Sequence, residues 1–206
     1  PGMVRLRLSS KGFDELELKN RIEQEIEKVK SLIEKYIYGY EEYGKEQPKL
    51  EEILGQLLLE KGLKLGLAES CTGGYISHLI TSVAGSSAYY NGCIVPYHNE
   101  FKHNLLKVDN HVFEKHGAVS RECVEAMAKE TLNVFNANVS IAVSGIAGPS
   151  GGTADKPVGT VWIAVAYGDK IFSKHFIFGD NRLRNIQMTA NAAMNMLRKL
   201  ILNIED

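Results

Sequence analysis

The sequence has few cysteines, almost no net charge and no long apolar run, and each deficit excludes a class of protein. Its three cysteines among 206 residues, Cys71, Cys93 and Cys123, are odd in number and widely spaced. Such a set fits neither a disulfide framework nor a zinc site and favours a reducing cytoplasm. The net charge of −1 argues against direct nucleic-acid binding. Without an apolar run of about 20 residues, or a signal peptide in residues 1–10, no membrane segment is expected.

The first part of the chain, residues 1–42, predicts a small α+β appendage. Alternating residues 4–8 (VRLRL) favour a half-exposed strand, and Asp14 can cap the helix that follows. Residues 37–38 favour a second short strand. These three elements are too few to close a core, and the charged helix is best interpreted as a solvated face, with partner binding as the alternative. Residues 43–48 are typical of a linker.

The second part, residues 49–206, alternates strands with helices and adds one late hairpin at residues 167–169. This pattern predicts a three-layer α/β/α sandwich with a mixed sheet covered on both faces. Strands are expected at 63–68, 88–95, 139–143, 160–166 and 170–178, and helices at 49–61, 75–83, 97–106, 110–115, 121–135 and 182–202.

The stretch LKLGLAESCTGG, residues 63–74, is a buried strand that runs through a sharp turn into a helix. The turn places Ser70 at the carboxyl end of the strand, where open α/β sheets bind ligands. The N–H groups of Thr72, Gly73 and Gly74 could hold an oxyanion there. Ser70 could instead be only a helix cap. Its neighbour Cys71 is intrinsically more nucleophilic, although buried packing is the usual role of such a cysteine.

A second glycine-rich loop, residues 144–159, follows the strand at 139–143 and contains SGIAGPSGG and KPVG. Small residues and free N–H groups at a strand end can form a cradle for phosphate or ribose. The alternative is an ordinary connection, and the loop's residues do not decide between the two. The loop lacks the lysine pattern of a Walker motif, which argues against an ATPase.

Five segments together resemble the signature segments of the CinA C-terminal domain family, in register from residue 49 to the end of the chain. They are AESCTGG (68–74), AGSSAYYNGCIVPYHNEFK (84–102), HGAVS (116–120), SGIAGPSGG (144–152) and KPVG (156–159). Residues 1–42 also resemble the end of the middle region that precedes this domain in full-length CinA. The resemblance therefore implies the C-terminal part of a longer protein.

That family includes PncC-type nicotinamide mononucleotide amidohydrolases, and the resemblance implies the same activity here. Nicotinamide mononucleotide would lose its carboxamide to give nicotinate mononucleotide and ammonia. By matching position, Ser70 would be the nucleophile and Lys102 the base, with Tyr97 between or beside them. A serine–lysine mechanism requires no metal and no cofactor, because a lysine whose pKa is lowered by burial can accept the serine proton.

For the substrate, the resemblance implies contacts from Ser144, Gly145 and Gly148 in the second loop, with Ser144 nearest. Arg182 is the candidate for the substrate phosphate, since a planar guanidinium suits a phosphate group. The sequence departs from the family here, because it reads GDNR at residues 179–182 where many members read GDR. Arg184 is therefore the alternative phosphate ligand.

Several plainer interpretations remain open from the sequence alone. Tyr97 could serve only in packing, and Lys102 could be a surface lysine. The runner-up function is a non-catalytic nucleotide-binding or scaffolding module associated with competence and the DNA-damage response. A small-molecule nucleotide is the expected partner, and the amphipathic helices allow a homodimer without requiring one. Five histidines lack metal-ligand spacing and are expected to have structural or solvent roles: residues 98, 103, 111, 116 and 175.

Overall fold

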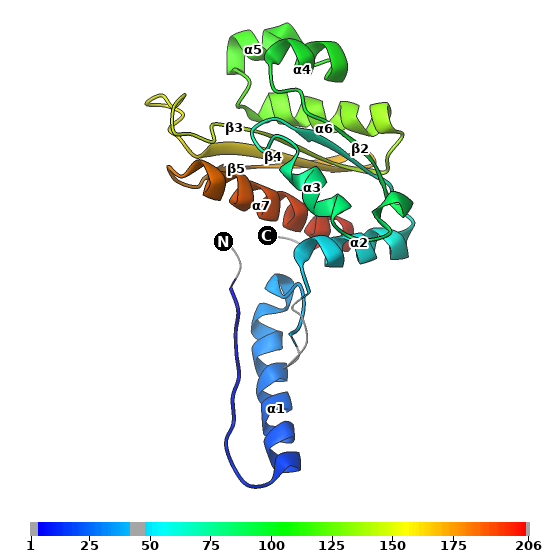
Figure 1. Ribbon diagram of the computed structural model, residues 1–206, viewed down its shortest axis with the longest axis vertical. Coiled ribbons are helices and arrows are strands. Elements are labelled where there is room, and N and C mark those ends of the chain that lie inside the picture. The colour runs from blue at the N-terminus through cyan, green and yellow to red at the C-terminus, as the bar shows by residue number, and fades with distance from the viewer. Residues whose placement is uncertain (1–3, 42–47, 205–206) are drawn as a thin grey trace. The chain divides into compact units, whose positions relative to one another are not determined.

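The computed structural model describes residues 4–41 and 48–204, which fall into two compact units divided between Pro48 and Lys49. The smaller unit contains one long helix, α1 (Glu15–Ile33), followed by a single 3-10 turn, η1 (Glu34–Tyr36) (Figure 1). Asp14 caps α1 as expected, because its carboxylate accepts hydrogen bonds from the N–H groups of Leu16 and Glu17 at 2.9 and 3.0 Å. No residue of α1 is buried, which agrees with a solvated helix.

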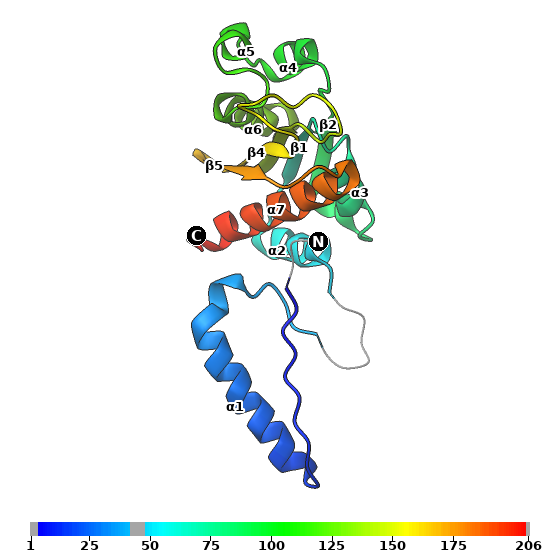
Figure 2. The same cartoon turned by 90° about the vertical axis from the view of Figure 1, so that its left-hand side faces the viewer.

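The prediction of two strands in this smaller unit is wrong. Residues 4–10 are extended but belong to no sheet, and residues 37–38 follow the 3-10 turn without pairing to any strand among the described residues. The extended segment runs beside α1 rather than beside another strand (Figures 1 and 2). An extended segment becomes a strand only when a neighbour supplies ladder hydrogen bonds, and a helix has none to give. The alternation in residues 4–8 therefore indicated an extended backbone correctly and a sheet incorrectly.

The larger unit has a five-stranded sheet in the order β2-β1-β3-β4-β5. Strands β2, β1 and β3 are parallel, and β4 and β5 continue the sheet in antiparallel fashion. Helix α6, with α4 and α5 outside it, covers one face, and α2, α3 and α7 cover the other (Figures 1 and 2). This arrangement confirms the predicted α/β fold. The strands are β1 (Leu65–Glu69), β2 (Tyr90–Ile94), β3 (Val139–Gly145), β4 (Thr160–Tyr167) and β5 (Lys170–Ile177). The helices are α2 (Leu50–Lys61), α3 (Tyr75–Thr81), η2 (Ser86–Ala88), α4 (Asn99–Leu106), α5 (Asn110–His116), α6 (Arg121–Phe135) and α7 (Arg182–Leu202).

Burial along the strands explains their places in the sheet. Every residue of β1 is buried, and so is every residue of β3 except the last, as expected for central strands covered on both faces. Gly66 lets α6 approach β1 closely, since a Cβ at that position would lie 2.9 Å from the Phe135 ring. Strand β5 is largely exposed at the sheet edge and joins β4 through the two-residue turn Gly168–Asp169, which confirms the predicted hairpin.

The register of the parallel strands positions the site. Glu69 of β1 pairs with Val143 of β3, so both strands reach the same edge of the sheet together. The Ser70 N–H then donates to the Val143 carbonyl at 3.1 Å, which places Ser70 close to Ser144. The connection from β1 to β2 runs through α3 on one face of the sheet, and the connection from β2 to β3 runs through α6 on the opposite face. Ligand crevices form at the edge of a sheet where successive connections lie on opposite faces.

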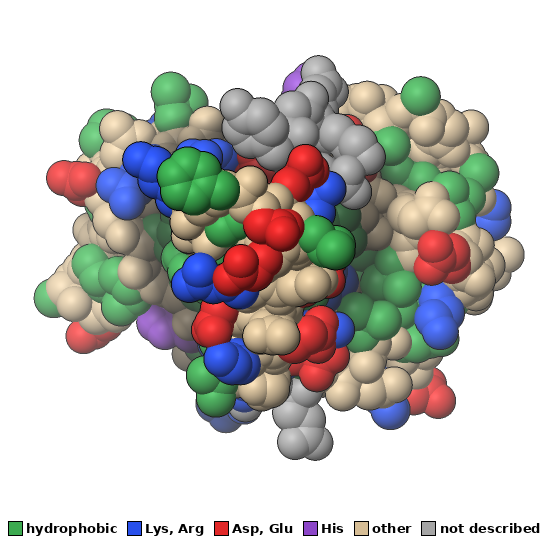
Figure 3. Space-filling view, turned by 90° about the horizontal axis from the view of Figure 1, so that it is seen from below, with side chains coloured by type: hydrophobic (Ala, Val, Ile, Leu, Met, Phe, Trp, Pro, Cys, Tyr) green, Lys and Arg blue, Asp and Glu red, His purple; other side chains and the backbone are tan. Residues whose placement is uncertain are grey.

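The surface is of mixed charge. On the face of the molecule shown in Figure 3, acidic and basic side chains are interspersed. This agrees with the net charge of −1. None of the helices in residues 4–41 and 48–204 is long and apolar enough to cross a bilayer.

Candidate active site

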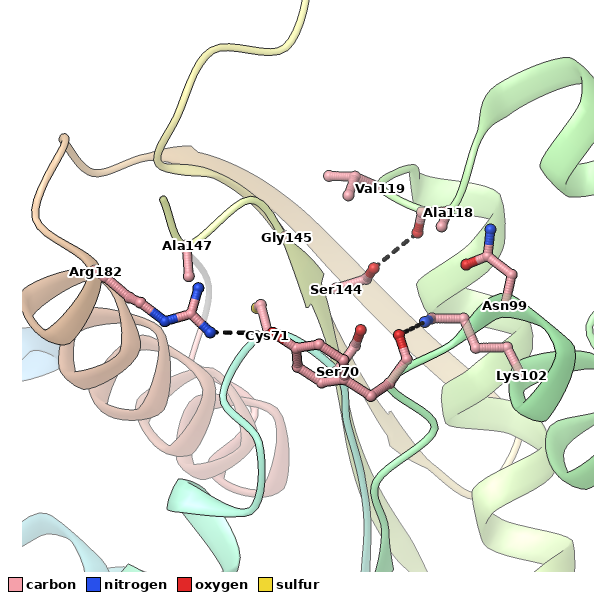
Figure 4. A pocket seen from close by; sticks show the side chains of 11 residues that line it. Ser70, Cys71, Asn99, Lys102, Ala118, Val119, Ser144, Gly145, Ala147 and Arg182 are labelled. Carbon is pink, nitrogen blue, oxygen red and sulfur yellow. Dashed lines mark hydrogen bonds between the residues drawn. The ribbon is translucent and has the colours of Figure 1, made fainter. Parts of the chain in front are cut away.

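A pocket of about 210 Å³ lies at the carboxyl edge of the parallel strands. It receives residues from the β1–α3 turn, the β2–α4 connection, α4, the segment before α6, the end of β3 with the loop after it, and the start of α7. In Figure 4, Arg182 and Lys102 stand on opposite sides of it, with Ser70 and Cys71 between them. The residues that line it are Ser70, Cys71, Tyr97, Asn99, Lys102, Ala118, Val119, Ser144, Gly145, Ala147 and Arg182.

The turn that carries Ser70 is held by the residue before it, Glu69, which the sequence analysis did not single out. The Glu69 side chain is fully buried. Its Oε2 accepts hydrogen bonds from the Thr72 hydroxyl at 2.6 Å, the Gly74 N–H at 3.1 Å and the Ile76 N–H at 3.0 Å. Its Oε1 accepts from the Ser77 N–H at 2.7 Å. The carboxylate thus caps α3 and satisfies N–H groups that a helix start leaves free.

This capping changes the expected roles of the three residues after Cys71. The Gly74 N–H is bound to Glu69, the Gly73 N–H donates to the Ser70 carbonyl at 3.1 Å, and the Thr72 hydroxyl is also bound to Glu69. None of the three lines the pocket. The structure therefore differs from the expectation that Gly73 and Gly74 donate to an oxyanion. Within the described residues, the N–H groups of Cys71 and Thr72 have no acceptor, and they are the free donors of this turn.

Lys102 is buried, with 1% of its surface exposed, so it is not a surface lysine. Its Nζ donates to the carbonyls of Pro96 at 2.8 Å and Tyr97 at 3.4 Å. Burial lowers the pKa of Lys102, because the charged ammonium loses its hydration. A neutral amine has two N–H donors and one lone pair. The two carbonyls can take both donors, which leaves the lone pair free to accept a proton.

Cys71 is a poor nucleophile in this setting. Burial raises the pKa of its thiol to about 12, so the thiol stays protonated at neutral pH. The thiolate, not the thiol, is the reactive form. Its sulfur packs against the backbone of Gly145, where an added Cβ would lie 3.1 Å away. Cys71 thus has the packing role that the sequence favoured.

Arg182 lies at the first position of α7 and reaches across the mouth of the pocket. Its two terminal nitrogens donate to the Gly148 carbonyl at 2.9 Å and to the Tyr97 hydroxyl at 3.0 Å. Gly148 itself does not line the pocket and contributes this carbonyl instead. Arg184 is exposed and does not line the pocket. Of the two arginines that the sequence left as alternatives, the fold therefore brings Arg182 to the site.

The second glycine-rich loop forms a wall of the pocket, and hydrogen bonds to neighbouring segments hold it. The Ser144 hydroxyl donates to the Ala118 carbonyl at 2.8 Å. Lys156 Nζ donates to the carbonyls of His116 and Val119 at 2.7 and 2.8 Å. Asn185 of α7 donates to the carbonyls of Ala147 and Gly179 at 3.0 and 2.9 Å.

The sequence analysis did not predict these supports or the pocket residue Asn99. Three of the four missed side chains, Glu69, Asn99 and Lys156, lie inside the segments quoted for the family resemblance, and Asn185 does not. A polar residue inside a motif was therefore the available signal, although its partner could not be read from the sequence.

Charge in the pocket has one sign. Its lining contains the basic side chains of Lys102 and Arg182 and no acidic side chain. Such a pocket favours a ligand that carries negative charge. Within the described residues, no group of three His, Cys, Asp or Glu side chains could hold a metal ion. The two histidines nearest the site have structural contacts: His98 caps α4, and His103 Nδ1 lies 2.8 Å from the Val108 carbonyl.

The family model for the CinA C-terminal domain matches residues 47–201. The chain belongs to the CinA C-terminal domain family. A CinA-like protein of Cytophaga hutchinsonii is 44% identical over 204 residues, which are 99% of this chain and 48% of that protein. The chain thus spans about half the length of the curated relatives it matches.

Solved structures of the CinA superfamily share the fold of the larger unit. A competence-damaged protein (CinA) superfamily protein from Klebsiella pneumoniae matches with a TM-score of 0.72 and 31% identity over 76% of this chain and 99% of that one. The competence/damage-inducible protein of Agrobacterium tumefaciens matches with a TM-score of 0.70 and 36% identity over 76% of this chain and 98% of that one.

Proposed function

We propose that this CinA domain is an amidohydrolase that removes the carboxamide of nicotinamide mononucleotide. The observation that carries the proposal is the convergence of Ser70, Lys102 and Arg182 on one pocket without an acidic side chain. A hydroxyl, a buried amine and a guanidinium supply a nucleophile, a base and a phosphate ligand. The resemblance stated from the sequence supplies the substrate.

In this reaction, Ser70 Oγ attacks the carboxamide carbon while the Lys102 lone pair accepts the hydroxyl proton. The oxygen of the tetrahedral intermediate carries the negative charge, and the free N–H group of Cys71, which lines the pocket, would stabilise it. An N–H from the residue after the nucleophile is a recurring oxyanion donor in hydrolases. Asn99 has both a donor and an acceptor, so it complements the carboxamide.

The intermediate collapses when the C–N bond breaks and Lys102 returns the proton to the leaving nitrogen, which departs as ammonia. Ser70 then carries the nicotinate acyl group as an ester. Water attacks this ester with Lys102 again accepting a proton. Nicotinate mononucleotide leaves, and the serine hydroxyl is restored. Arg182 holds the phosphate throughout, since a guanidinium and a phosphate match in charge and geometry.

Ammonia release from nicotinamide mononucleotide by the purified protein tests this proposal. We expect Ser70→Ala to lower the rate by about 10³-fold or more, because the covalent route is lost. Ser82→Ala is the matched serine control, since the Ser82 hydroxyl caps the end of α3 and donates to the Leu79 carbonyl. If Ser70→Ala instead released ammonia at the wild-type rate and Cys71→Ala did not, the nucleophile would be the Cys71 thiol. Nucleotide binding without ammonia release would favour the scaffolding module.

A further inference from the structure

Tyr97 joins the two cationic side chains of the pocket. Its hydroxyl accepts a hydrogen bond from the Arg182 guanidinium at 3.0 Å, and its own carbonyl accepts one from Lys102 Nζ at 3.4 Å. The Tyr97 backbone is fixed further by its N–H, which donates to the Val95 carbonyl at 2.9 Å. One residue of the β2–α4 connection is therefore bonded both to the candidate phosphate ligand and to the candidate base.

The bond between Arg182 and the Tyr97 hydroxyl is one that an anion can replace. A phenol is a neutral acceptor, whereas a phosphate oxygen makes a shorter, charge-assisted bond and can take two parallel N–H groups of one guanidinium. Both terminal nitrogens of Arg182 now bind neutral oxygens, those of Gly148 and Tyr97. The Tyr97 side chain is 60% exposed, so its hydroxyl can exchange the arginine for water at little cost.

We propose that Arg182 and Tyr97 form a latch that the phosphate of the substrate opens, coupling recognition of the anion to the surroundings of Lys102. This inference rests on the proposed function. When Arg182 turns to a phosphate, the Tyr97 phenol is released, and the segment whose carbonyls hold Lys102 Nζ loses its outer tether. Phosphate binding then changes the bonds around the base, not only the affinity for substrate.

The latch predicts which substrates are processed efficiently. Binding energy from a remote group raises kcat only when it is used to improve the reacting geometry. A phosphate that acts solely as an anchor would lower KM and leave kcat unchanged. A phosphate that opens a latch raises kcat as well. The site should therefore prefer nucleoside monophosphates to nucleosides at saturating concentrations of both.

The kinetic test compares nicotinamide mononucleotide with nicotinamide riboside, which lacks the phosphate, with and without inorganic phosphite. For the wild type we expect a kcat on the riboside lower by about tenfold or more, and a partial recovery when phosphite is added. Both effects should disappear in Arg182→Met. In Tyr97→Phe, the ratio of the two kcat values should approach one whatever the absolute rate. Arg184→Met, which changes the exposed neighbour outside the pocket, should keep both effects.

A second measurement detects the opening of the latch between Arg182 and Tyr97 without requiring turnover. In protein labelled with ¹³Cζ-tyrosine, the Tyr97 signal, assigned by its loss in Tyr97→Phe, should shift on titration with phosphite in the wild type and in Arg184→Met. It should not shift in Arg182→Met. If the wild type releases no ammonia from the mononucleotide, the proposed function fails, and this titration still decides the latch. An unshifted wild-type signal, or equal kcat values with only KM changed, would overturn the latch and leave the proposed amidohydrolase standing.

Discussion

Glu69 and Lys102 are two buried ionisable side chains of the candidate site, and they differ in the number of their hydrogen-bond partners. Glu69 is fully enclosed and accepts hydrogen bonds from four groups of its own turn and of α3. Among the residues that the structure describes, Lys102 has two carbonyl acceptors, one at 2.8 Å and one at 3.4 Å. A buried charge whose hydrogen bonds are complete stabilises one geometry. A buried charge with few partners stays available for proton transfer.

The largest expected effect concerns the amine. Lys102→Met keeps the length of the side chain and removes the base, so we expect kcat for ammonia release to fall by about 10³-fold or more while the substrate still binds. Steady-state kinetics together with a calorimetric titration measure both quantities. Lys115→Met, an exposed lysine on α5, is the control and should retain the wild-type rate. Full activity in Lys102→Met would remove Lys102 from the mechanism.

The next effect concerns the carboxylate and should appear in stability. Glu69→Ala leaves three N–H groups and one hydroxyl without their acceptor inside the protein, which we expect to cost about 3–5 kcal/mol of the free energy of unfolding. Urea denaturation followed by circular dichroism measures this loss. Glu60→Ala, on the exposed face of α2, should change the free energy by less than about 0.5 kcal/mol. A Glu69→Ala variant as stable as the control would contradict the capping role.

The pH dependence of the rate should follow the titration of the Lys102 amine alone. Burial lowers the pKa of Lys102 from its ordinary value, so the neutral form is present at lower pH than for an exposed lysine. The neutral fraction grows with pH, and the rate should rise about tenfold per pH unit below this pKa and level off above it. Between the lowered pKa and the ordinary one, the unfolded chain binds more protons, so the contribution of Lys102 to stability also rises with pH. A rate that falls as pH rises through this range would exclude the base role.

The smallest expected effect distinguishes two possible roles of Thr72, structural support and substrate binding. Thr72→Val removes one donor to Glu69 at nearly constant volume, and we expect a loss of about 1 kcal/mol in the free energy of unfolding with little change in KM. Thr72→Ser, which keeps the hydroxyl, should recover most of this stability. A raised KM at unchanged stability would show instead that the hydroxyl contacts substrate.

The sequence predicted the parts of the site that depend on strand ends. Buried runs at residues 63–68 and 139–143 predicted two core strands, each followed by a glycine-rich turn at its carboxyl end. The family resemblance, rather than the strand pattern, placed Ser70 and Ser144 at one substrate site. The helices were predicted equally well, because their caps and apolar stripes are local signals.

The sequence did not predict contacts that join distant segments through side chains. Nothing near Arg182 indicates that it reaches Tyr97, and nothing near Lys156 indicates that it binds the carbonyls of His116 and Val119. The free N–H groups expected at Gly73 and Gly74 failed for a related reason. A glycine-rich turn shows which donors the backbone offers, whereas the acceptor that occupies them, here Glu69, is fixed only when the chain has folded.

The pairing of β1 with β3 sets an order of events during synthesis. Leu65 aligns with Val139, and the Ser70 N–H is bound to the Val143 carbonyl, although α3, η2, β2, α4, α5 and α6 separate the two strands in the chain. At about 5–20 residues per second, a ribosome delivers β3 several seconds after β1. Until then the nascent chain lacks the neighbour that completes the serine turn. The geometry around Ser70 is thus completed only after β3 has been synthesised.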